Sequence, residues 1–314
     1  MVLNIFHFTS KQRHPIMQVF EAQMQQCVRK KLILRRNCLQ IPNETPERLL
    51  RDLLPINPSL VYDVGANVGH FTVIAGELGH SVVSFEANPK TCSQLREKIN
   101  SHRLKSVQVY CVAVGNNNSE VQVDTSSLDS ASTSVIAGDS SSASAEVQMV
   151  KMKTLDSISI NHTIFLLKSD TQGYELEVLK GALKTLQRSR PIILVELSYS
   201  LLNKIGNTRP SAVANFLYAH LDYLCTYLAV HTKISTAKYG IIEDFQFLSE
   251  ECIIPTYMMD KLLLRPYNKA NNTGWTDLLC FDPLKLIHLV EYESSRLLRD
   301  LRYRVRTLSH FCAN

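Results

Sequence analysis

One short segment constrains the fold of this chain more than any other. An apolar run over residues 60–64 carries Asp63 near its end, and a loop bounded by Gly65 and Gly69 follows it. A helical pattern starts directly after the loop, over residues 70–78. Glycine lacks a Cβ and the first N–H groups of a helix are free, so such a loop lets the backbone approach a ligand. The segment therefore predicts an α/β domain with a binding site at the end of this strand.

The residues beyond this loop alternate between strand-like and helical patterns. Strands are predicted over residues 81–85, 107–114, 165–169, 192–196, 223–230 and 276–281, and helices over 89–101, 174–186 and 211–221. Alternation at this spacing favours parallel strands joined by crossover helices. The predicted fold class is α/β, with a mostly parallel, seven-stranded, Rossmann-like sheet flanked by helices.

The chain divides into three predicted regions. Residues 1–57 carry helical patterns interrupted by prolines and form an N-terminal helical extension, residues 58–283 form the main domain, and residues 284–314 form a C-terminal basic helix. A length of 314 residues suits one core with appendages better than two full domains. Within the main domain, the Ser-rich stretch 126–145 lies between two segments of alternating polarity, which predicts a β-hairpin-like insertion.

Charge, cysteine spacing and the lengths of apolar runs limit the partners and the location expected for this protein. A formal net charge of +5 permits an anionic partner, but a nucleic-acid-binding protein usually concentrates its positive charge on one face. The 8 cysteines show neither C-x-x-C nor zinc-ligand spacing, so they are predicted to be reduced thiols. The sequence contains no apolar run long enough to span a bilayer and no secretory signal pattern. A cytoplasmic location is therefore expected.

The glycine loop separates two classes of ligand. Dinucleotide-binding loops follow G-x-G-x-x-G, whereas Asn67 and His70 stand at the second and third glycine positions here. This departure argues against NAD. The spacing Asp-x-Gly-x-x-x-Gly suits a smaller zwitterionic ligand such as S-adenosylmethionine, whose carboxylate can face the loop amides. The predicted binding residues are Asp63, Gly65, Asn67 and Gly69.

A second acidic residue favours a ligand that contains a nucleoside. Glu86 follows the second predicted strand, about twenty residues beyond the loop, where a carboxylate can accept hydrogen bonds from both ribose hydroxyls. Loop and acid each stand at the carboxyl end of a parallel strand, which is the edge at which such sheets bind ligands. Their combination favours S-adenosyl-L-methionine as the cofactor.

These motifs together resemble the FkbM-type S-adenosylmethionine-dependent methyltransferase family. VYDVGANVGHFT resembles its cofactor loop, FEANP its ribose-binding segment, VYCVAVGNNNSEV the stretch near the adenine, and FLLKSDTQGYELEVLKGA its most distinctive block. The resemblance covers residues 60–281 and implies a class I methyltransferase fold. It adds Asn88 and Ala113 to the residues expected at the cofactor. The distinctive block departs from the family at Gln172, where the family has an acidic residue.

Two carboxylates are candidates for catalysis. Methyl transfer is an in-line displacement, and a hydroxyl acceptor attacks only as its proton begins to leave. Asp170 follows the strand over residues 165–169 and is the first candidate for a general base, with a helix-capping Asp as the alternative. Glu196 ends the next strand and faces the same rim. The sequence has no clear His and Asp set with metal-ligand spacing, so no metal is expected.

The predicted function is transfer of a methyl group to a hydroxyl of a sugar, glycan or other small metabolite, with the oxygen acceptor implied by the resemblance. A nucleic-acid or protein methyltransferase is the alternative. The amino-methylating motif Asn/Asp-Pro-Pro-Tyr/Phe is replaced by Ser-Asp-Thr-Gln over residues 169–172, so nucleic acid is disfavoured as a partner. A third interpretation is a cofactor-binding module without turnover, because Gln172 lacks the charge that the family carries there.

Overall fold

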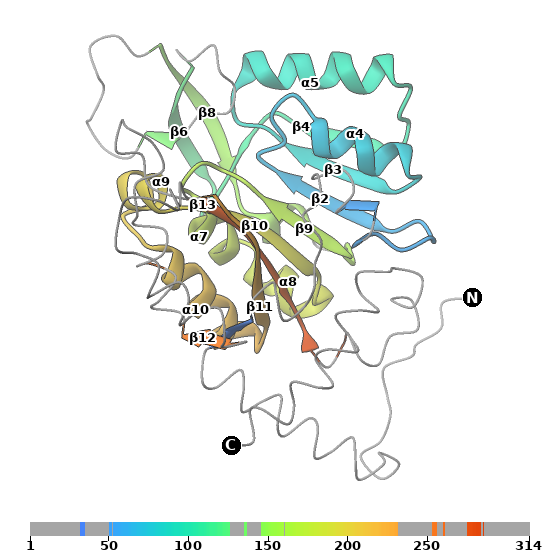
Figure 1. Cartoon of the computed structure of the whole chain (residues 1–314). Helices are drawn as coiled ribbons and strands as arrows, with labels where there is room; N and C mark the ends of the chain where they lie inside the picture. Colours follow the sequence, from blue (N-terminus) through green and yellow to red (C-terminus); the bar gives the residue numbers. More distant parts are fainter. Residues whose placement is uncertain are drawn as a thin grey trace, which may run out of the picture.

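A nine-stranded sheet forms the centre of the structure, a computed structural model that describes residues 32–34, 50–51, 53–125, 135–136, 146–159, 161–231, 253–255, 260, 275–283 and 285 (Figure 1). In spatial order its strands are β12 (Ile253–Pro255), β1 (Leu32–Leu34), β11 (Leu224–His231), β13 (Trp275–Phe281), β10 (Ile192–Ser198), β9 (Leu166–Ser169), β2 (Leu60–Val64), β3 (Ser81–Phe85) and β4 (Val107–Tyr110).

Most neighbouring strands in this sheet are parallel. The strands β4, β3, β2, β9 and β10 pair in parallel, whereas β13 runs antiparallel between β10 and β11. A parallel sheet is covered on both faces, which explains why its central strands are apolar runs in the sequence. The predicted α/β, Rossmann-like fold class is confirmed, and the short strands β1 and β12 extend one edge beyond the seven strands expected.

The predicted terminal regions are described only in part. Leu32–Leu34, inside the expected helical extension 1–57, form a strand that pairs in parallel with β11. The helical prediction is wrong for these three residues, because a neighbouring strand supplies their hydrogen-bond partners. Most of this extension and nearly all of the predicted C-terminal basic helix, residues 284–314, lie outside the described residues.

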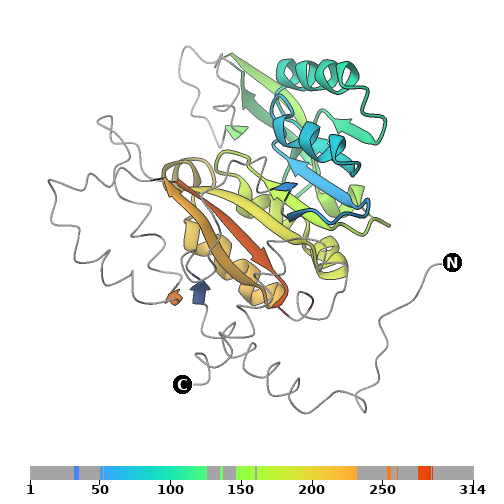
Figure 2. The ribbon, with the colours of Figure 1, turned by 45° about the vertical axis from the view of Figure 1, so that its right-hand side comes forward.

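Helices cover both faces of the sheet. On one face lie α4 (His70–Glu77) and α5 (Pro89–Ser101), and on the other lie α7 (Glu175–Lys180), α8 (Leu183–Ser189) and α10 (Pro210–Leu221) (Figure 1, Figure 2). Two shorter helices are α6 (Leu155–Ile158) and α9 (Tyr199–Lys204). Buried apolar side chains of the central strands and these helices form the main core. None of the helices that the structure describes is both long and apolar enough to cross a membrane.

A second, smaller sheet stands beside the first. Its order is β5 (Ala113–Val114), β8 (Val147–Lys153), β6 (Ser119–Asp124) and β7 (Val135–Ile136). The antiparallel pair of β6 and β8 corresponds to the two arms of the predicted insertion. Apart from β7, residues 126–145 lie outside the described residues. The predicted strand over 107–114 is split, because the chain leaves the main sheet after Tyr110 and joins β8 through β5.

The helix predicted over residues 174–186 is also divided, into α7 and α8. A Cβ placed on Gly181 would lie 1.9 Å from the carbonyl oxygen of Gly115, so another segment of backbone packs against this point. The carbonyl of Gly181 accepts a hydrogen bond from the Asp156 amide at 2.9 Å. These contacts between distant segments interrupt a pattern that is helical throughout in the sequence.

Four cysteines form disulfides, which corrects the expectation of reduced thiols for these residues. Cys92 on α5 is bonded to Cys111 after β4, and their Cα atoms are 5.7 Å apart. Cys225 on β11 is bonded to Cys280 on β13, its partner in the strand register. The fold brings together residues that are distant in sequence, so the spacing of the cysteines gave no sign of either bond.

Candidate cofactor and acceptor site

The cofactor loop is held between the ends of two strands. Gly65 has a φ of 74°, and the amides of Gly65 and Ala66 both donate to the carbonyl of Phe85 at 3.0 Å. A Cβ on Gly65 would lie 1.8 Å from the backbone oxygen of Asp170. Sequence reasoning explained this glycine by close approach of a ligand. The structure adds that the loop packs directly against the residue expected to act as the base.

The second glycine of the loop packs against α5. Gly69 has a φ of 82°, and a Cβ there would lie 2.3 Å from Cδ1 of Leu95. Leu95 is fully buried, in a cluster with Ala66 and Val73. Helix α4 therefore starts where the loop packs against α5. This packing orients the free N–H groups in the first turn of α4.

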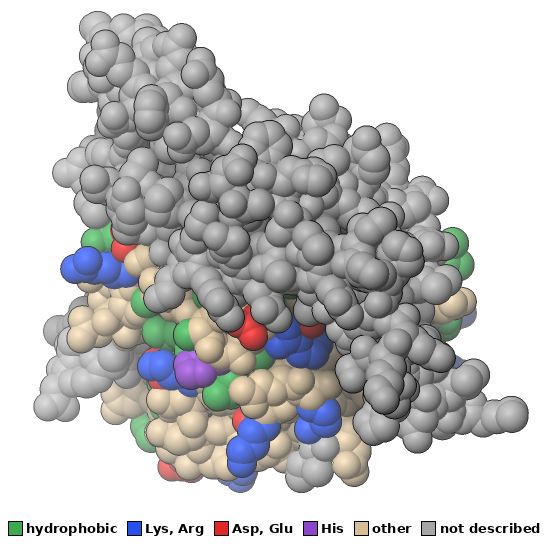
Figure 3. All heavy atoms as spheres, turned by 90° about the horizontal axis from the view of Figure 1, so that it is seen from below, with side chains coloured by type: hydrophobic (Ala, Val, Ile, Leu, Met, Phe, Trp, Pro, Cys, Tyr) green, Lys and Arg blue, Asp and Glu red, His purple; other side chains and the backbone are tan. Residues whose placement is uncertain are grey.

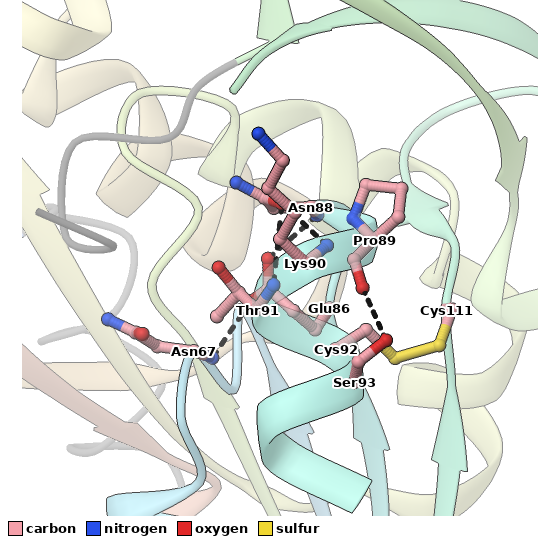
Figure 4. The surroundings of a disulfide bond; sticks show 9 residues. All are labelled: Asn67, Glu86, Asn88, Pro89, Lys90, Thr91, Cys92, Ser93 and Cys111. Atoms are coloured by element: carbon pink, nitrogen blue, oxygen red, sulfur yellow. Dashed lines mark hydrogen bonds between the residues drawn. A yellow bond between two sulfur atoms is a disulfide. The ribbon is translucent and has the colours of Figure 1, made fainter. Parts of the chain in front are cut away.

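Glu86 is a buried carboxylate with one backbone donor on each oxygen. Its Oε2 accepts from the amide of Asn67 and its Oε1 from the amide of Asn88, both at 2.8 Å (Figure 4). Burial raises the pKa of Glu86 above its usual range, and these two hydrogen bonds oppose that rise. A carboxylate has about four acceptor positions, so capacity remains on both oxygens for the two hydroxyls of a ribose.

The two residues added by the resemblance have structural roles beside this carboxylate. The side-chain oxygen of Asn88 accepts from the amide of Lys90 at 2.9 Å and caps α5, while Pro89 occupies the first turn. Ala113 is buried in β5 and packs in the cluster of the smaller sheet with Met152. Direct contact of either residue with the cofactor stays a prediction.

A partly buried lysine joins the loop to the candidate base. Lys168 Nζ donates to the carbonyl of Gly65 at 3.0 Å and lies 3.3 Å from Asp63 and 3.5 Å from Asp170. Burial opposes the charge of Lys168, but Asp63 and Asp170 outweigh it and raise its pKa. Asp63 is fully buried, and its other oxygen accepts from the hydroxyl of Thr72 at 2.6 Å. This arrangement favours an ordering role for Asp63.

Asp170, Gln172 and Glu196 meet at the strand ends. Ser169 pairs with Val195 in the parallel register, so Asp170 and Glu196 follow side by side. The side-chain nitrogen Nε2 of Gln172 donates to Asp170 at 2.7 Å and lies 3.4 Å from Glu196. The residue that departs from the family pattern thus supplies a donor between two acids.

A third carboxylate, which sequence reasoning missed, extends this group. Asp277 pairs with Glu196 across β13 and β10. Burial, followed by repulsion from Asp170, raises the pKa of Glu196 to about 8 and that of Asp277 to about 6, and Lys168 opposes both shifts. An acidic residue inside an otherwise apolar predicted strand was the signal that could have identified Asp277. We refer to Asp170, Glu196 and Asp277 as the carboxylate row.

The loop after β9 is built around the buried side chain of Glu175. Its Oε1 accepts from the amides of Thr171 at 2.9 Å and Gly173 at 3.0 Å. Gln172, between these two donors, has a left-handed φ of 57°. Burial raises the pKa of Glu175 to about 7, although the hydrogen bond from Gly173 acts in the opposite direction. Glu175 therefore shapes the loop that presents Asp170 and Gln172.

Two further observations concern other ligands. Among the residues that the structure describes, no three His, Cys, Asp or Glu side chains are arranged to hold a metal ion. On the face seen from below, the described Lys and Arg side chains are separated by neutral and acidic ones rather than gathered in one field (Figure 3). The site itself is dominated by carboxylates.

Solved structures that match this chain are distant from it in sequence. The methyltransferase FkbM from Methylobacillus flagellatus KT is 14% identical with a TM-score of 0.40, and the match covers 84% of this chain and 58% of that one. An rRNA methylase from Streptococcus thermophilus is 10% identical with a TM-score of 0.39, covering 76% and 98%. SMU.1697c from Streptococcus mutans, in complex with SAH, is 13% identical with a TM-score of 0.39, covering 76% and 100%. These similarities are too low to transfer a substrate.

A family comparison covers most of the site. A search of curated proteins finds no match. The family model of the methyltransferase FkbM domain matches residues 63–232, more than half of the 314 residues. The matched region includes the glycine loop, Glu86 and the loop after β9, and it supports S-adenosyl-L-methionine as the cofactor. The predicted resemblance is thereby confirmed, and the chain belongs to the FkbM family of methyltransferases.

Proposed function

We propose that this chain transfers the methyl group of S-adenosyl-L-methionine to a hydroxyl oxygen of a sugar, glycan or other small metabolite. The carboxylate row beside the glycine loop carries the proposal. Asp170 adjoins the loop through its backbone oxygen and reaches Gln172 through its side chain. The acceptor and the cofactor would therefore meet at Asp170.

The nucleoside end of the cofactor is assigned to Glu86. Backbone amides hold both oxygens of this carboxylate in place, and each keeps acceptor capacity for a ribose hydroxyl. A charged dinucleotide phosphate would meet the acids Asp63 and Asp170 at the neighbouring strand end, with Lys168 already paired to both. The arrangement thus favours a ligand with a cationic centre over a pyrophosphate.

Proton transfer from the acceptor is assigned to Asp170. When bound, S-adenosyl-L-methionine supplies an electrophilic methyl group on a sulfonium. Asp170 would take up the hydroxyl proton of the acceptor as the methyl group is transferred. Lys168 and Gln172 fix this carboxylate from two sides. With a pKa of about 8, Glu196 holds a proton at neutral pH and can donate a hydrogen bond to a second acceptor hydroxyl.

The polarity of the row supports a polyhydroxyl acceptor. Carboxylates and the carbonyl of Gln172 accept hydrogen bonds, and hydroxyl groups donate them. A phosphate-rich acceptor such as RNA would face repulsion from the Asp170 carboxylate. The alternative of a binding module without turnover is favoured by one observation, the neutral Gln172 at the position of the family's acid.

Cofactor binding is the first test of the proposal. We expect calorimetric titration with S-adenosylhomocysteine to give binding by the wild type and at least a tenfold loss for Glu86→Gln, because the amide group must face one of two backbone N–H donors. Glu97→Gln, an exposed position on α5, is the matched control and should bind as the wild type does. Equal affinity in all three proteins would exclude Glu86 from the site.

Turnover then separates the acceptor classes. Release of S-adenosylhomocysteine is measured with separate panels of glycans and polyols, RNA, and proteins. Turnover with the first panel, lost in Asp170→Asn without loss of cofactor binding, is the expected result. Turnover only with RNA or protein would overturn the proposed acceptor, and cofactor binding without turnover on any panel would favour the binding module.

A further inference from the structure

The Cys92–Cys111 disulfide is part of a closed circuit of bonds that includes Glu86, the acid assigned to the ribose. The amide of Cys92 donates to the carbonyl of Asn88 at 2.8 Å, and the amide of Asn88 donates to Glu86 Oε1 at 2.8 Å. The amide of Glu86 donates to the carbonyl of Tyr110 at 3.0 Å, and Tyr110 precedes Cys111 in the chain. The disulfide, the Tyr110–Cys111 peptide link and these three hydrogen bonds thus form a closed circuit that includes Glu86. Figure 4 shows the disulfide and Asn88 beside Glu86.

Within this circuit, the disulfide links helix α5 covalently to the segment between β4 and β5. Cys92 lies in the first turn of α5, shortly after the N-cap residue Asn88. Cys111 stands where the chain leaves the main sheet, between β4 and β5. Backbone hydrogen bonds also connect these elements to Glu86, but such bonds open more readily than a covalent link. Breaking the disulfide would therefore widen the range of positions open to Glu86 and its two amide donors.

We propose that the Cys92–Cys111 disulfide is a redox modification site that controls cofactor affinity, with a dithiol as its reductant. The disulfide form holds Glu86 ready for the ribose, and the reduced form binds the cofactor more weakly. The inference rests on the proposed placement of the ribose at Glu86. A dithiol opens such a bond by thiol–disulfide exchange, and its second thiol resolves the mixed disulfide.

The exchange has a defined direction of attack. Cys92 is fully buried, whereas Cys111 is half-buried, so the thiolate of the dithiol attacks the sulfur of Cys111. The Cys92 sulfur leaves as a thiolate and takes up a proton. The second thiol of the reductant then attacks the mixed disulfide and releases Cys111 as a thiol. Two electrons and two protons have passed to the protein, and the reductant has become a disulfide.

Affinity and redox state must be coupled in both directions. If reduction weakens cofactor binding about tenfold, within the usual 5- to 150-fold range of such couplings, then bound ligand must make reduction of the disulfide less favourable by the same factor. For a two-electron couple a tenfold change corresponds to about 30 mV in the reduction potential. Saturating ligand should therefore lower the potential of the Cys92–Cys111 pair by about 30 mV.

The test titrates the full chain with S-adenosylhomocysteine before and after reduction with dithiothreitol, and peptide mass spectrometry reports which disulfide is open. We expect about tenfold weaker binding once Cys92–Cys111 is reduced. The variant Cys92→Ser with Cys111→Ser should bind weakly and ignore the reductant. The control Cys225→Ala with Cys280→Ala should still respond, because that disulfide lies across β11 and β13.

Each outcome decides the inference. Unchanged affinity after reduction of Cys92–Cys111, or a response that persists in the Cys92→Ser, Cys111→Ser variant, would overturn it while leaving the proposed function intact. An oxidised wild type that binds no S-adenosylhomocysteine would overturn both. Protection by the ligand separates local from global opening, since it should shift the potential of Cys92–Cys111 and leave that of Cys225–Cys280 unchanged.

Discussion

At the scale of single residues, Gly65 stands where the ends of β2 and β9 meet. Its backbone has a positive φ, and a Cβ would lie 1.8 Å from the Asp170 oxygen. Gly79 offers a natural comparison, because it has a similar φ of 88° but no heavy atom within 4 Å of a Cβ. Substitutions at the two glycines therefore separate the free-energy cost of the positive φ from the free-energy cost of the steric contact.

We expect Gly79→Ala to lower the free energy of unfolding by about 1 kcal/mol, since only the left-handed backbone is penalised. Gly65→Ala adds a collision with backbone and should cost about 3 kcal/mol or more. Urea unfolding of both variants gives the two values. Binding of S-adenosylhomocysteine should be lost in Gly65→Ala alone, and equal costs for both variants would contradict the close contact.

At the scale of elements, the loop after β9 depends on Glu175. This carboxylate is nearly fully buried and receives backbone amides from both sides of Gln172. Burial raises its pKa from 4.5 to about 7. The folded state then holds the proton more tightly than the unfolded state. The contribution of this group favours folding at low pH and is lost as the pH rises from about 4.5 through about 7.

A Glu175→Gln variant cannot ionise at this position and should lack this pH dependence. Relative to the wild type, its free energy of unfolding should improve between pH 4.5 and pH 8 by up to about 3 kcal/mol, at about 1.4 kcal/mol per pKa unit. Urea unfolding at a series of pH values measures the difference. The exposed Glu97→Gln control should show no such trend, and a difference that stays constant with pH would refute the buried ionisation.

At the scale of the whole molecule, the two disulfides among the described residues have separate roles. Cys92–Cys111 lies beside the cofactor site, while Cys225–Cys280 joins β11 to β13 within the sheet and closes a loop with a sequence separation of 55. Cys225 and Cys280 are both fully buried. We therefore expect the Cys225–Cys280 disulfide to stabilise the fold rather than to position Glu86.

Replacing Cys225 and Cys280 together by Ala should lower the free energy of unfolding by about 4 kcal/mol, because the unfolded chain regains the entropy of a long loop. The change is a large part of the usual stability of a domain. The affinity for S-adenosylhomocysteine should stay within about twofold of the wild type wherever the variant is folded. A stable variant that has lost binding would place this disulfide in the site after all.

Local patterns in the sequence determined the fold class and the glycine loop. Strand and helix periodicities, a glycine that must turn and an acid at a strand end are properties of neighbouring residues, so they can be identified without the fold. Glu86, Asp170 and Glu196 were predicted as site residues in this way, because the carboxyl ends of parallel strands share one edge.

Only the tertiary structure decided how these residues are joined. Contacts between segments far apart in the chain decided the pairing of Asp277 with Glu196, the approach of the Gln172 side-chain amide to Glu196, the interruption at Gly181 and the two described disulfides. Such contacts follow from the register and packing of the sheet, and a local pattern carries no information about them.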